Sequence, residues 1–203
     1  MNIQVFREPG LFFIVNDFIS MDAQNMFLES LIQKDFERGK FIESSNSANE
    51  AEAAELVLDE TTKKVDSFEL TRQNPFINYF LERFYSDRML HAFEQSGDEL
   101  FSLLTFLREG SYQVSRFGEG YFYDNHRDYA LISANLYLAH QDKVPFQGGD
   151  LYVRGFRIPF QPRTLVVFPG SYRHRVGRVT NVPSSLLSHR YSLQYWPAFC
   201  NKH

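Results

Sequence analysis

The stretch that decides the fold is HRDYALISANLYLAH, residues 126–140. Polar and apolar residues alternate along it, which is typical of a β-strand with one buried and one exposed face. His126 and Asp128 open the stretch, and side chains at positions i and i+2 of a strand point to the same face. The pattern therefore predicts a half-buried strand that directs an imidazole and a carboxylate at one point, as a metal site requires.

The sequence after Gly110 has the residue pattern of a β-domain. Its short segments are β-branched or aromatic and are separated by Gly, Pro or Asp. These segments are SYQVSRF (111–117), ALISANLYLA (130–139), DLYVRGF (150–156), TLVVFPG (164–170) and HRYSLQYW (189–196). Many short strands separated by such turn-forming residues predict a β-sandwich or barrel.

Residues 1–107 predict a strand followed by supporting helices. GLFFIVNDFIS (10–20) reads as the strand, and Ser20 can cap a helix over residues 21–36. Apolar residues recur in that helix at roughly helical spacing, namely Met21, Met26, Phe27, Leu31 and Ile32. Residues 75–94 and 98–110 show similar intervals and predict helices that back a sheet.

The segment 43–64 interrupts this pattern. It has no aromatic residue and is rich in Ser, Ala, Asn and Glu, so we expect a mobile surface loop. The alternative is a lid over a site, because long loops in compact domains are often functional.

Composition limits the class of protein. Of the 203 residues, 43% are hydrophobic and 16% aromatic, which predicts a globular chain. The formal net charge of −4 does not favour nucleic acid as a partner. The single cysteine, Cys200, excludes an internal disulfide and a cysteine zinc cluster. The sequence shows no signal pattern and no apolar run of membrane-span length, so we expect a cytoplasmic protein without a membrane partner.

Together these features predict an α+β, β-rich fold: a double-stranded β-helix, or jelly roll, with an N-terminal helical layer packed on one sheet. We expect residues 1–203 to form a single domain. Residues 1–107 would supply the strand and supporting helices, and residues 108–197 the jelly-roll core.

A third metal ligand is needed beside His126 and Asp128, and His174 is the leading candidate. It follows a buried-looking strand closed by Pro-Gly and begins HRV, where the chain re-enters a sheet. We expect it to meet the first two ligands only if the sheets curl over each other, as in a jelly roll. The remaining candidates are His91, His140, His189 and His203.

Two alternatives compete with this metal site. His140 and Asp142 also form an H-x-D pair, but in a loop-like context where the side chains need not share a face. His126 and Asp128 can also be read as the charged rim at the start of a surface strand.

Arg190 and Ser192 again share a strand face. An arginine directed into a barrel is expensive to bury unless it pairs with an anion, and its planar fork suits a carboxylate. This predicts an acidic co-substrate beside the metal site. The alternative is a surface arginine on an edge strand.

With these residues the chain resembles the Fe(II)/2-oxoglutarate-dependent oxygenases, specifically the small prolyl-4-hydroxylase-like group that acts on peptidyl substrates. The resemblance covers about residues 108–197. It rests on five motifs in the family's order: RFGEGYFYDNHRD (116–128), LISANLYL (131–138), FQGGDLYV (146–153), FPGSYRHRV (168–176) and RYSLQYW (190–196).

The resemblance implies a role for each matching residue. Fe(II) would be held by His126, Asp128 and His174. The far carboxylate of 2-oxoglutarate would pair with Arg190 and accept hydrogen bonds from Ser192 and Tyr137. The co-substrate slot would be lined by Leu151 and Val176, with Trp196 packed near its base. O2 is the second co-substrate that the family implies, and ascorbate is a further cofactor consistent with it.

The implied function is hydroxylation of an unactivated C–H bond, in a prolyl or other peptidyl residue, with succinate and CO2 as co-products. Residues expected on the substrate side are Arg116, Tyr123, Asp124, Arg127, Asn135 and Arg154. The alternative substrate is a free amino acid or small metabolite, which would need a charged recess. The sequence indicates no oligomeric state.

Other functions are weighed against this one. Related halogenases replace the carboxylate ligand with a small residue, so Asp128 favours hydroxylation. Relatives that demethylate nucleic acids have a second arginine shortly after the anchoring one, where this chain has Leu193, Gln194 and Tyr195. From other classes, a non-catalytic jelly-roll binding or sensing module and a metal-dependent isomerase or lyase on a cupin-like barrel remain as alternatives.

Overall fold

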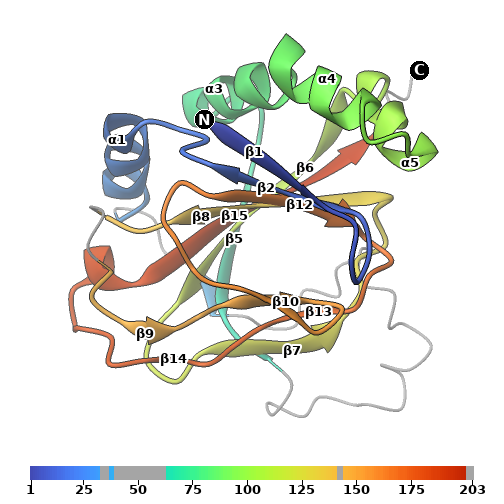
Figure 1. Ribbon diagram of the computed structural model, residues 1–203. Helices are drawn as coiled ribbons and strands as arrows, with labels where there is room; N and C mark the ends of the chain where they lie inside the picture. The colour runs from blue at the N-terminus through green and yellow to red at the C-terminus, as the bar shows by residue number, and fades with distance from the viewer. Residues whose placement is uncertain (33–36, 39–62, 141–143, 200–203) are drawn as a thin grey trace.

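The computed structural model describes residues 1–32, 37–38, 63–140 and 144–199. Two antiparallel sheets face each other, and helices cover the outer face of the larger sheet (Figure 1). This arrangement confirms the expected β-rich jelly roll with a helical layer on one sheet. Among the described helices, none is both long enough and apolar enough to cross a membrane.

The larger sheet has eight strands. In order across the sheet they are β1 (Asn2–Phe6), β2 (Phe12–Asn16), β12 (Leu165–Pro169), β8 (Ile132–Leu138), β15 (Arg190–Ala198), β6 (Glu109–Phe117), β5 (Asp66–Leu70) and β3 (Glu37–Arg38). β15 pairs along its whole length with β6 and over half of it with β8. The C-terminal strand therefore lies at the centre of the sheet and joins segments that are far apart in sequence.

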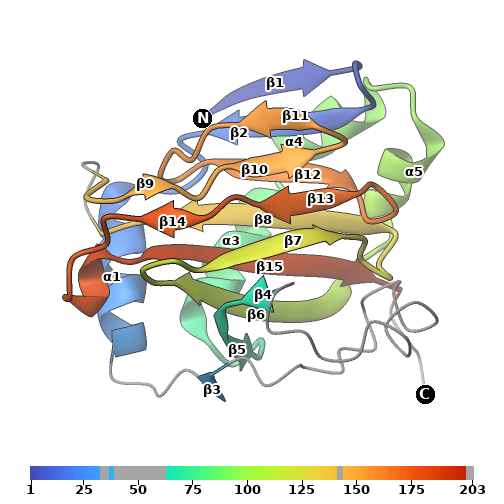
Figure 2. The same ribbon diagram turned by 90° about the horizontal axis from the view of Figure 1, so that it is seen from below.

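The smaller sheet has five strands and faces the side of the larger sheet that is away from the helices (Figures 1 and 2). Its order is β11 (Phe156–Ile158), β10 (Leu151–Val153), β13 (His174–Val176), β7 (Phe122–His126) and β4 (Lys63–Lys64). A separate two-stranded ribbon consists of β9 (Gln147–Gly148) and β14 (Val179–Thr180).

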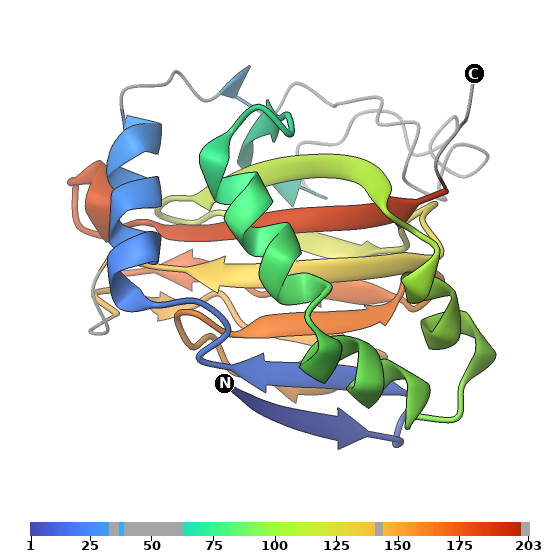
Figure 3. The same cartoon turned by 90° about the horizontal axis from the view of Figure 1, so that it is seen from above.

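The helices lie side by side over the larger sheet (Figure 3). The α-helices are α1 (Met21–Ile32), α3 (Pro75–Phe84), α4 (Asp87–Glu94) and α5 (Glu99–Ser102), and the 3₁₀ turns are η1 (Leu103–Thr105) and η2 (Leu186–Ser188). The expected cap of α1 is present, because Ser20 Oγ accepts a hydrogen bond from the backbone N–H of Ala23 at 3.2 Å.

The buried stripe of α1 differs from the one expected. Phe27, Leu28 and Leu31 are buried, whereas Met26 is 71% exposed. The stripe runs through position 24 instead, where Gln24 Oε1 accepts a hydrogen bond from the backbone N–H of Ala139 at 3.4 Å. Gln24 is therefore buried because it accepts a hydrogen bond from the backbone beyond β8, and the search for apolar residues at helical spacing could not find it.

The two faces of the larger sheet have different chemistry. On β15, Tyr191, Leu193 and Tyr195 belong to the core beneath the helices, which we call the helix-side core. Arg190 and Ser192 alternate with them and point to the opposite side, toward the smaller sheet, which we call the interior face. The period of two along the strand thus separates an apolar core from a polar interior.

The sequence-based expectation of a half-buried strand over 126–140 is wrong for β8. Every residue of β8 is buried, because helices cover one face and the smaller sheet covers the other. The alternation of polar and apolar residues in β8 therefore separates core from interior, and not core from solvent.

Some expectations fall outside the described residues. These are residues 43–62 of the expected mobile segment, and also Asp142, Cys200 and His203. Residues 63 and 64 form β4.

The helix-side core generates a first prediction. Phe84 is fully buried and packs on Phe80, Phe93 and Tyr195. Phe84→Ala should lower the free energy of unfolding by about 3–5 kcal/mol, because it removes apolar contacts and leaves a cavity. Urea denaturation measures the change. Phe106→Ala is the matched control, since Phe106 is 68% exposed, and a similar loss in both variants would contradict the assigned core.

Candidate metal and co-substrate site

Two histidines on neighbouring strands form one part of the site. His126 is the last residue of β7 and His174 is the first of β13, and the antiparallel register makes them direct cross-strand partners. Both are buried, and their ring centroids are 4.1 Å apart. The register alone therefore brings together two residues 48 positions apart, from 126 to 174.

Asp128 completes the cluster. Its Oδ1 lies 3.8 Å from His126 Nε2, and its Oδ2 lies 3.5 Å from His174 Nε2. One ligand atom from each of the three residues falls within 4.8 Å of the others. Two imidazoles and one carboxylate in this arrangement are a donor set that suits Fe(II) and leaves coordination positions open.

The path of the chain to Asp128 differs from the expectation. His126 and Asp128 do not open one strand, because β7 ends at His126 and β8 begins at Ile132. β7 belongs to the smaller sheet and β8 to the larger, so the chain must cross between sheets here. In this crossing, the backbone N–H of Asp128 donates to the carbonyl of Gly170 at 2.9 Å. His174 meets His126 within one sheet, so the expected curling of one sheet over the other is not what joins them.

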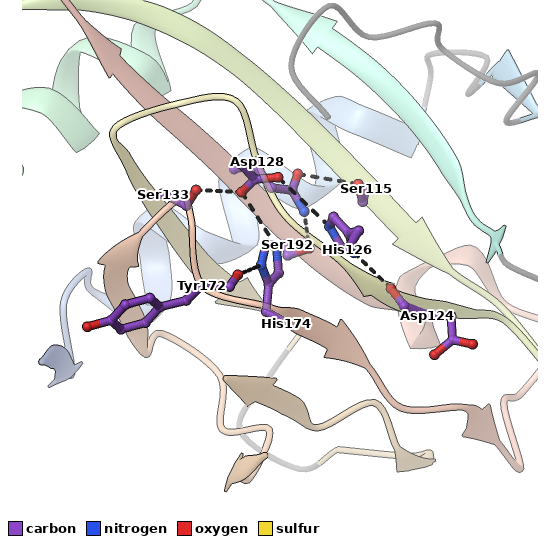
Figure 4. A network of polar contacts seen from close by, with 9 residues as sticks. Ser115, Asp124, His126, Asp128, Ser133, Tyr172, His174 and Ser192 are labelled. Atoms are coloured by element: carbon purple, nitrogen blue, oxygen red, sulfur yellow. Dashed lines mark hydrogen bonds and ion pairs between the residues drawn. The ribbon is translucent and has the colours of Figure 1, made fainter. Parts of the chain in front are cut away.

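A backbone carbonyl orients each imidazole (Figure 4). His126 Nδ1 lies 2.8 Å from the carbonyl oxygen of Asp124, and His174 Nδ1 lies 2.9 Å from that of Tyr172. Because a carbonyl oxygen can only accept, Nδ1 carries the hydrogen in both rings. Each Nε2 is therefore left with its lone pair for a metal, which is the usual way that a ligating histidine is held.

Ser133 is a functional residue that the sequence analysis missed. Its hydroxyl donates a hydrogen bond to Asp128 Oδ2 (Figure 4), and the residue is 1% exposed. Ring contacts fix the histidines in turn: Tyr123 stacks on His126 at 3.7 Å between centroids, and Phe168 meets His174 edge-on at 4.8 Å. The cluster is thus preorganised by its neighbours.

The competing histidines lie elsewhere. His140 Nε2 is 3.4 Å from the carboxylate of Glu29, a partner far from the cluster in sequence. His91 lies on α4 in the helical layer. His189 follows η2, and burial lowers its pKa. Within the described residues, only His126, Asp128 and His174 form a group able to hold a metal ion.

The second part of the site is the buried cation of Arg190. Arg190 is 1% exposed, and its Nε donates to the carbonyl of Gly149 at 2.8 Å and its Nη1 to Ser192 Oγ at 3.3 Å. The guanidinium carbon lies 4.6 Å from the ring centroid of Phe117 and 5.1 Å from that of Phe160. Burial lowers the pKa of Arg190 to about 10, so the group remains charged at neutral pH.

Tyr137 provides the test of whether an anion fits here. It lies on β8 as the register partner of Ser192, and its buried hydroxyl has no hydrogen-bond partner within the described residues. Its ring centroid is 5.4 Å from the guanidinium carbon of Arg190, which forms no ion pair in the described part of the chain. Burial raises the pKa of Tyr137, so it stays protonated as a donor. A carboxylate would satisfy both groups.

Apolar walls lie beside this anion pocket. Leu151 and Val176 face each other in the β10–β13 pair. Leu151 is in the same buried cluster as Tyr137, and Val176 packs against that cluster. Both therefore lie close to Tyr137, and their role as the lining of a co-substrate slot stays a prediction.

Trp196 lies elsewhere than expected. Its side chain points to the same interior face of β15 as that of Arg190. Trp196 is six positions further along the strand, however, which separates the two residues by roughly 20 Å. There it pairs with Ser111 and lines a surface cavity. The expectation that Trp196 packs near the base of the slot is therefore corrected, because Arg190 marks that base at the other end of the strand.

The expected substrate-side residues divide into two groups. Arg116 is wrong for this role, because it points to the helix side, where its Nη2 lies 2.6 Å from Asp66 Oδ2. Asn135 is on the interior face as the partner of Gln194. The rest lie at or near the histidine end of the smaller sheet: Tyr123 on β7, exposed Asp124 and Arg127 beside His126, and Arg154 in the turn after β10.

Two further interior residues escaped the sequence analysis. Gln194 Nε2 donates to Ser192 Oγ at 2.7 Å, and Ser115 Oγ donates to Gln194 Oε1 at 3.3 Å. These two hydrogen bonds hold the Ser192 hydroxyl in place beside Arg190. The spacing of positions 190, 192 and 194 was the available signal, since alternate residues of one strand share a face.

Gly149 is the other residue whose role only the structure shows. Its φ is +74°, and a Cβ there would lie 2.6 Å from Arg190 Cδ. Glycine is therefore required both for the backbone and for the space that Arg190 occupies. The Gly-Gly pair at 148–149 was its only sequence signal.

Comparisons with known proteins agree with this geometry. Residues 112–197 match the family model described as the 2OG-Fe(II) oxygenase superfamily. A crystal structure of a Pseudomonas putida prolyl-4-hydroxylase is similar, with 18% identity, a TM-score of 0.61, and coverage of 94% of this chain and 93% of that chain. HygX from Streptomyces hygroscopicus, crystallised with nickel and 2-oxoglutarate bound, is similar with 10% identity, a TM-score of 0.54, and coverage of 93% and 83%. No curated protein matches the chain.

The two structural likenesses concern the fold, while the family match spans every strand that carries the histidine cluster and the buried arginine. The donor set suits Fe(II), and the anion pocket suits a dicarboxylic co-substrate. Residues 112–197 are therefore similar to the 2OG-Fe(II) oxygenase superfamily, and the site has the donor set and the anion pocket that a 2-oxoglutarate-dependent dioxygenase requires.

Proposed function

We propose that this dioxygenase hydroxylates an unactivated C–H bond of a prolyl or other peptidyl residue. In this proposal His126, Asp128 and His174 bind Fe(II), and Arg190 anchors 2-oxoglutarate. The bound iron supplies the oxidative chemistry, in which O2 and 2-oxoglutarate become succinate and CO2 while C–H becomes C–OH.

The protein's own groups position the reactants. Ser133 holds the carboxylate of Asp128 between the two imidazoles. At the other end of the slot, Arg190 pairs with the far carboxylate of the co-substrate, and the Tyr137 hydroxyl donates to the same carboxylate. Ser192 orients Arg190 through the contact between its Oγ and Nη1. The co-substrate is thereby fixed at both ends.

A surface cavity whose lining includes Tyr129, the residue after Asp128, supports a peptidyl substrate. It has a volume of about 720 Å³ and is lined by residues 129–131, 196–199 and 109–111. Tyr129 and Leu131 line it and are 44% and 45% exposed, so the cavity opens to solvent and presents apolar surface to a substrate side chain. The presence of Tyr129, the residue after a proposed metal ligand, in this lining is the observation that carries the proposal. The similar Pseudomonas putida protein is a prolyl-4-hydroxylase, which is consistent with it.

A free amino acid fits the same cavity less well. Its ammonium and carboxylate groups would require paired charges in the lining. The charged lining residue is Glu109, and its carboxylate is already 3.4 Å from Arg72 Nη1. The cavity therefore favours a side chain whose ends continue as peptide.

Removal of the carboxylate ligand tests the enzyme class. Asp128→Ala should reduce succinate formation at least ~100-fold, which exceeds the usual loss for an outer partner of a metal ligand. Succinate is measured by mass spectrometry after Fe(II), 2-oxoglutarate and air are supplied. Asp87→Ala is the matched control, because Asp87 is an exposed aspartate on α4, in the helical layer. Unchanged turnover in Asp128→Ala would reject the assigned ligands and favour a non-catalytic module.

Ser133→Ala tests how Asp128 is held. The variant leaves all three proposed ligands in place but removes the hydroxyl that donates to Asp128. We expect Fe(II) affinity to fall roughly 10- to 100-fold, as is usual when an outer partner of a metal ligand is lost. Anaerobic calorimetric titration with Fe(II) measures this. Wild-type affinity would show that the hydroxyl has no influence on the metal.

Tyr137→Phe tests the anion pocket. A hydrogen bond to a charged group contributes about 1.5–3 kcal/mol, so 2-oxoglutarate should bind roughly 10- to 100-fold more weakly. Anaerobic titration of the iron-loaded protein, followed by the visible absorption of the chelate, measures the affinity. Without co-substrate the free energy of unfolding should not fall, because the hydroxyl has no partner within the described residues. Unchanged affinity for 2-oxoglutarate would remove Tyr137 from the pocket.

A further inference from the structure

Three arginines follow the histidine row of the smaller sheet. The pairing of β10, β13 and β7 makes Val153, His174 and His126 one cross-strand row. One position further along, the same antiparallel register places a second row, and the backbone N–H of residue 154 donates to the carbonyl of residue 173 at 2.8 Å. The members of this second row are Arg154, Arg173 and Arg127.

The arginine row is exposed and uncompensated. All three residues are exposed, and none forms an ion pair within the described part of the chain. Like charges that face one another across neighbouring strands destabilise a sheet. The row is therefore unfavourable for the isolated fold, in a chain whose formal net charge is −4.

The backbone at Arg154 adds a second cost. Arg154 and Gly155 form the two-residue turn between β10 and β11, with φ of 51° and 85°. Turns of this left-handed kind favour Asn and Gly, because a larger side chain is strained at positive φ. An arginine here holds a conformation that asparagine would adopt more easily. Its guanidinium carbon lies 4.9 Å from the ring centroid of Tyr172, beside the row.

The positive surface continues over the outer face of the smaller sheet. The guanidinium carbon of Arg175 lies 3.9 Å from the ring centroid of Tyr152. The nearby carboxylate of Asp150 is already paired with Arg157, at 2.6 Å, while Asp124 on β7 is exposed. The outer face therefore carries more cations than anions.

The rim changes character at the proposed metal ligand. Arg127, a member of the basic row, precedes Asp128 in the chain, and Tyr129, a member of the cavity lining, follows it. Exposed aromatic and aliphatic side chains line that cavity, and Phe199 among them is 54% exposed. A substrate that covers residues 127–129 therefore reaches one member of each surface.

We propose that the substrate is an acidic peptide, whose acidic side chains bind Arg127, Arg154 and Arg173 while a hydrophobic side chain enters the cavity of residues 129–131 and 196–199. This inference rests on the proposed peptidyl hydroxylase function. Charge complementarity selects the acidic part, and the exposed apolar lining selects the hydrophobic part. A nucleic acid fits less well, because it carries a phosphate at every nucleotide and would bring phosphates to Glu109 and the apolar lining.

Binding of a matched peptide pair tests the proposal. Two fluorescein-labelled peptides share a Leu-Pro-Leu centre and differ only in a following run of Glu or Gln. Fluorescence anisotropy measures their affinity for the full chain with Mn(II) and 2-oxoglutarate, without O2. We expect the Glu peptide to bind roughly 10-fold more tightly, as three exposed ion pairs allow. Higher salt should reduce this difference.

The arginine row is then removed. In the combined variant Arg127→Gln, Arg154→Asn and Arg173→Gln, the preference for Glu over Gln should be lost. Its thermal midpoint should not fall, because like charges and a strained turn are relieved. Arg88→Gln is the control, an exposed arginine on α4, and it should keep the preference. Leu131→Gln should weaken binding of the peptide with the Leu-Pro-Leu centre. It should not weaken binding of a peptide whose two central Leu residues are replaced by Gln.

Three outcomes overturn the inference: equal binding of the two peptides by the wild type, a preference that survives in the combined variant, or tighter binding of an oligothymidylate than of the Glu peptide. Binding is measured without turnover, which separates this inference from the proposed function. Equal binding together with succinate formation rejects only the acidic substrate. A lasting preference for Glu, in a wild type that forms no succinate, rejects only the hydroxylase.

Discussion

Burial of the Arg190 charge is the constraint on which the barrel depends. A guanidinium removed from water costs several kcal/mol unless charges or dipoles compensate it. Here Gly149 offers a carbonyl, Ser192 a hydroxyl, and Phe117 an aromatic face. None of these is an anion, so the charge is only partly compensated. The apolar helix-side core on the other face of the same sheet supplies the stability that tolerates this cost.

The barrel thereby acquires two chemically different ends. At one end the Arg190 guanidinium and the Tyr137 hydroxyl form a pocket that suits an anion. At the other, the register of β7 and β13 sets His126 against His174, and the crossing between sheets delivers Asp128 to them. Ser192 and Gln194 continue from the first end along β15 through a chain of hydrogen bonds. A ligand with two acidic ends, such as 2-oxoglutarate, would offer one end to each of these two groups of residues.

Much of this site could be predicted from the sequence, because its residues have types and spacings that few other sites share. His126, Asp128 and His174 lie together as expected, and Arg190 is buried on the interior face, while their functional roles stay predictions. The errors arose where the face to which a side chain points, or the sheet to which a strand belongs, decides its surroundings. Arg116 has a suitable type but the wrong parity, and β8 alternates although both its faces are covered. Ser133 was missed because its partner Asp128 lies across a turn whose course depends on Gly170.

The alternation along β15 has an evolutionary consequence. Tyr191, Leu193 and Tyr195 anchor the strand in the helix-side core, while the residues between them face the reactants. Substitutions of Tyr191, Leu193 or Tyr195 therefore act mainly on stability, whereas substitutions of the interior residues act on the chemistry and, as at Arg190, also on stability. The stability that the helix-side core supplies therefore limits how far a lineage can change the polar interior.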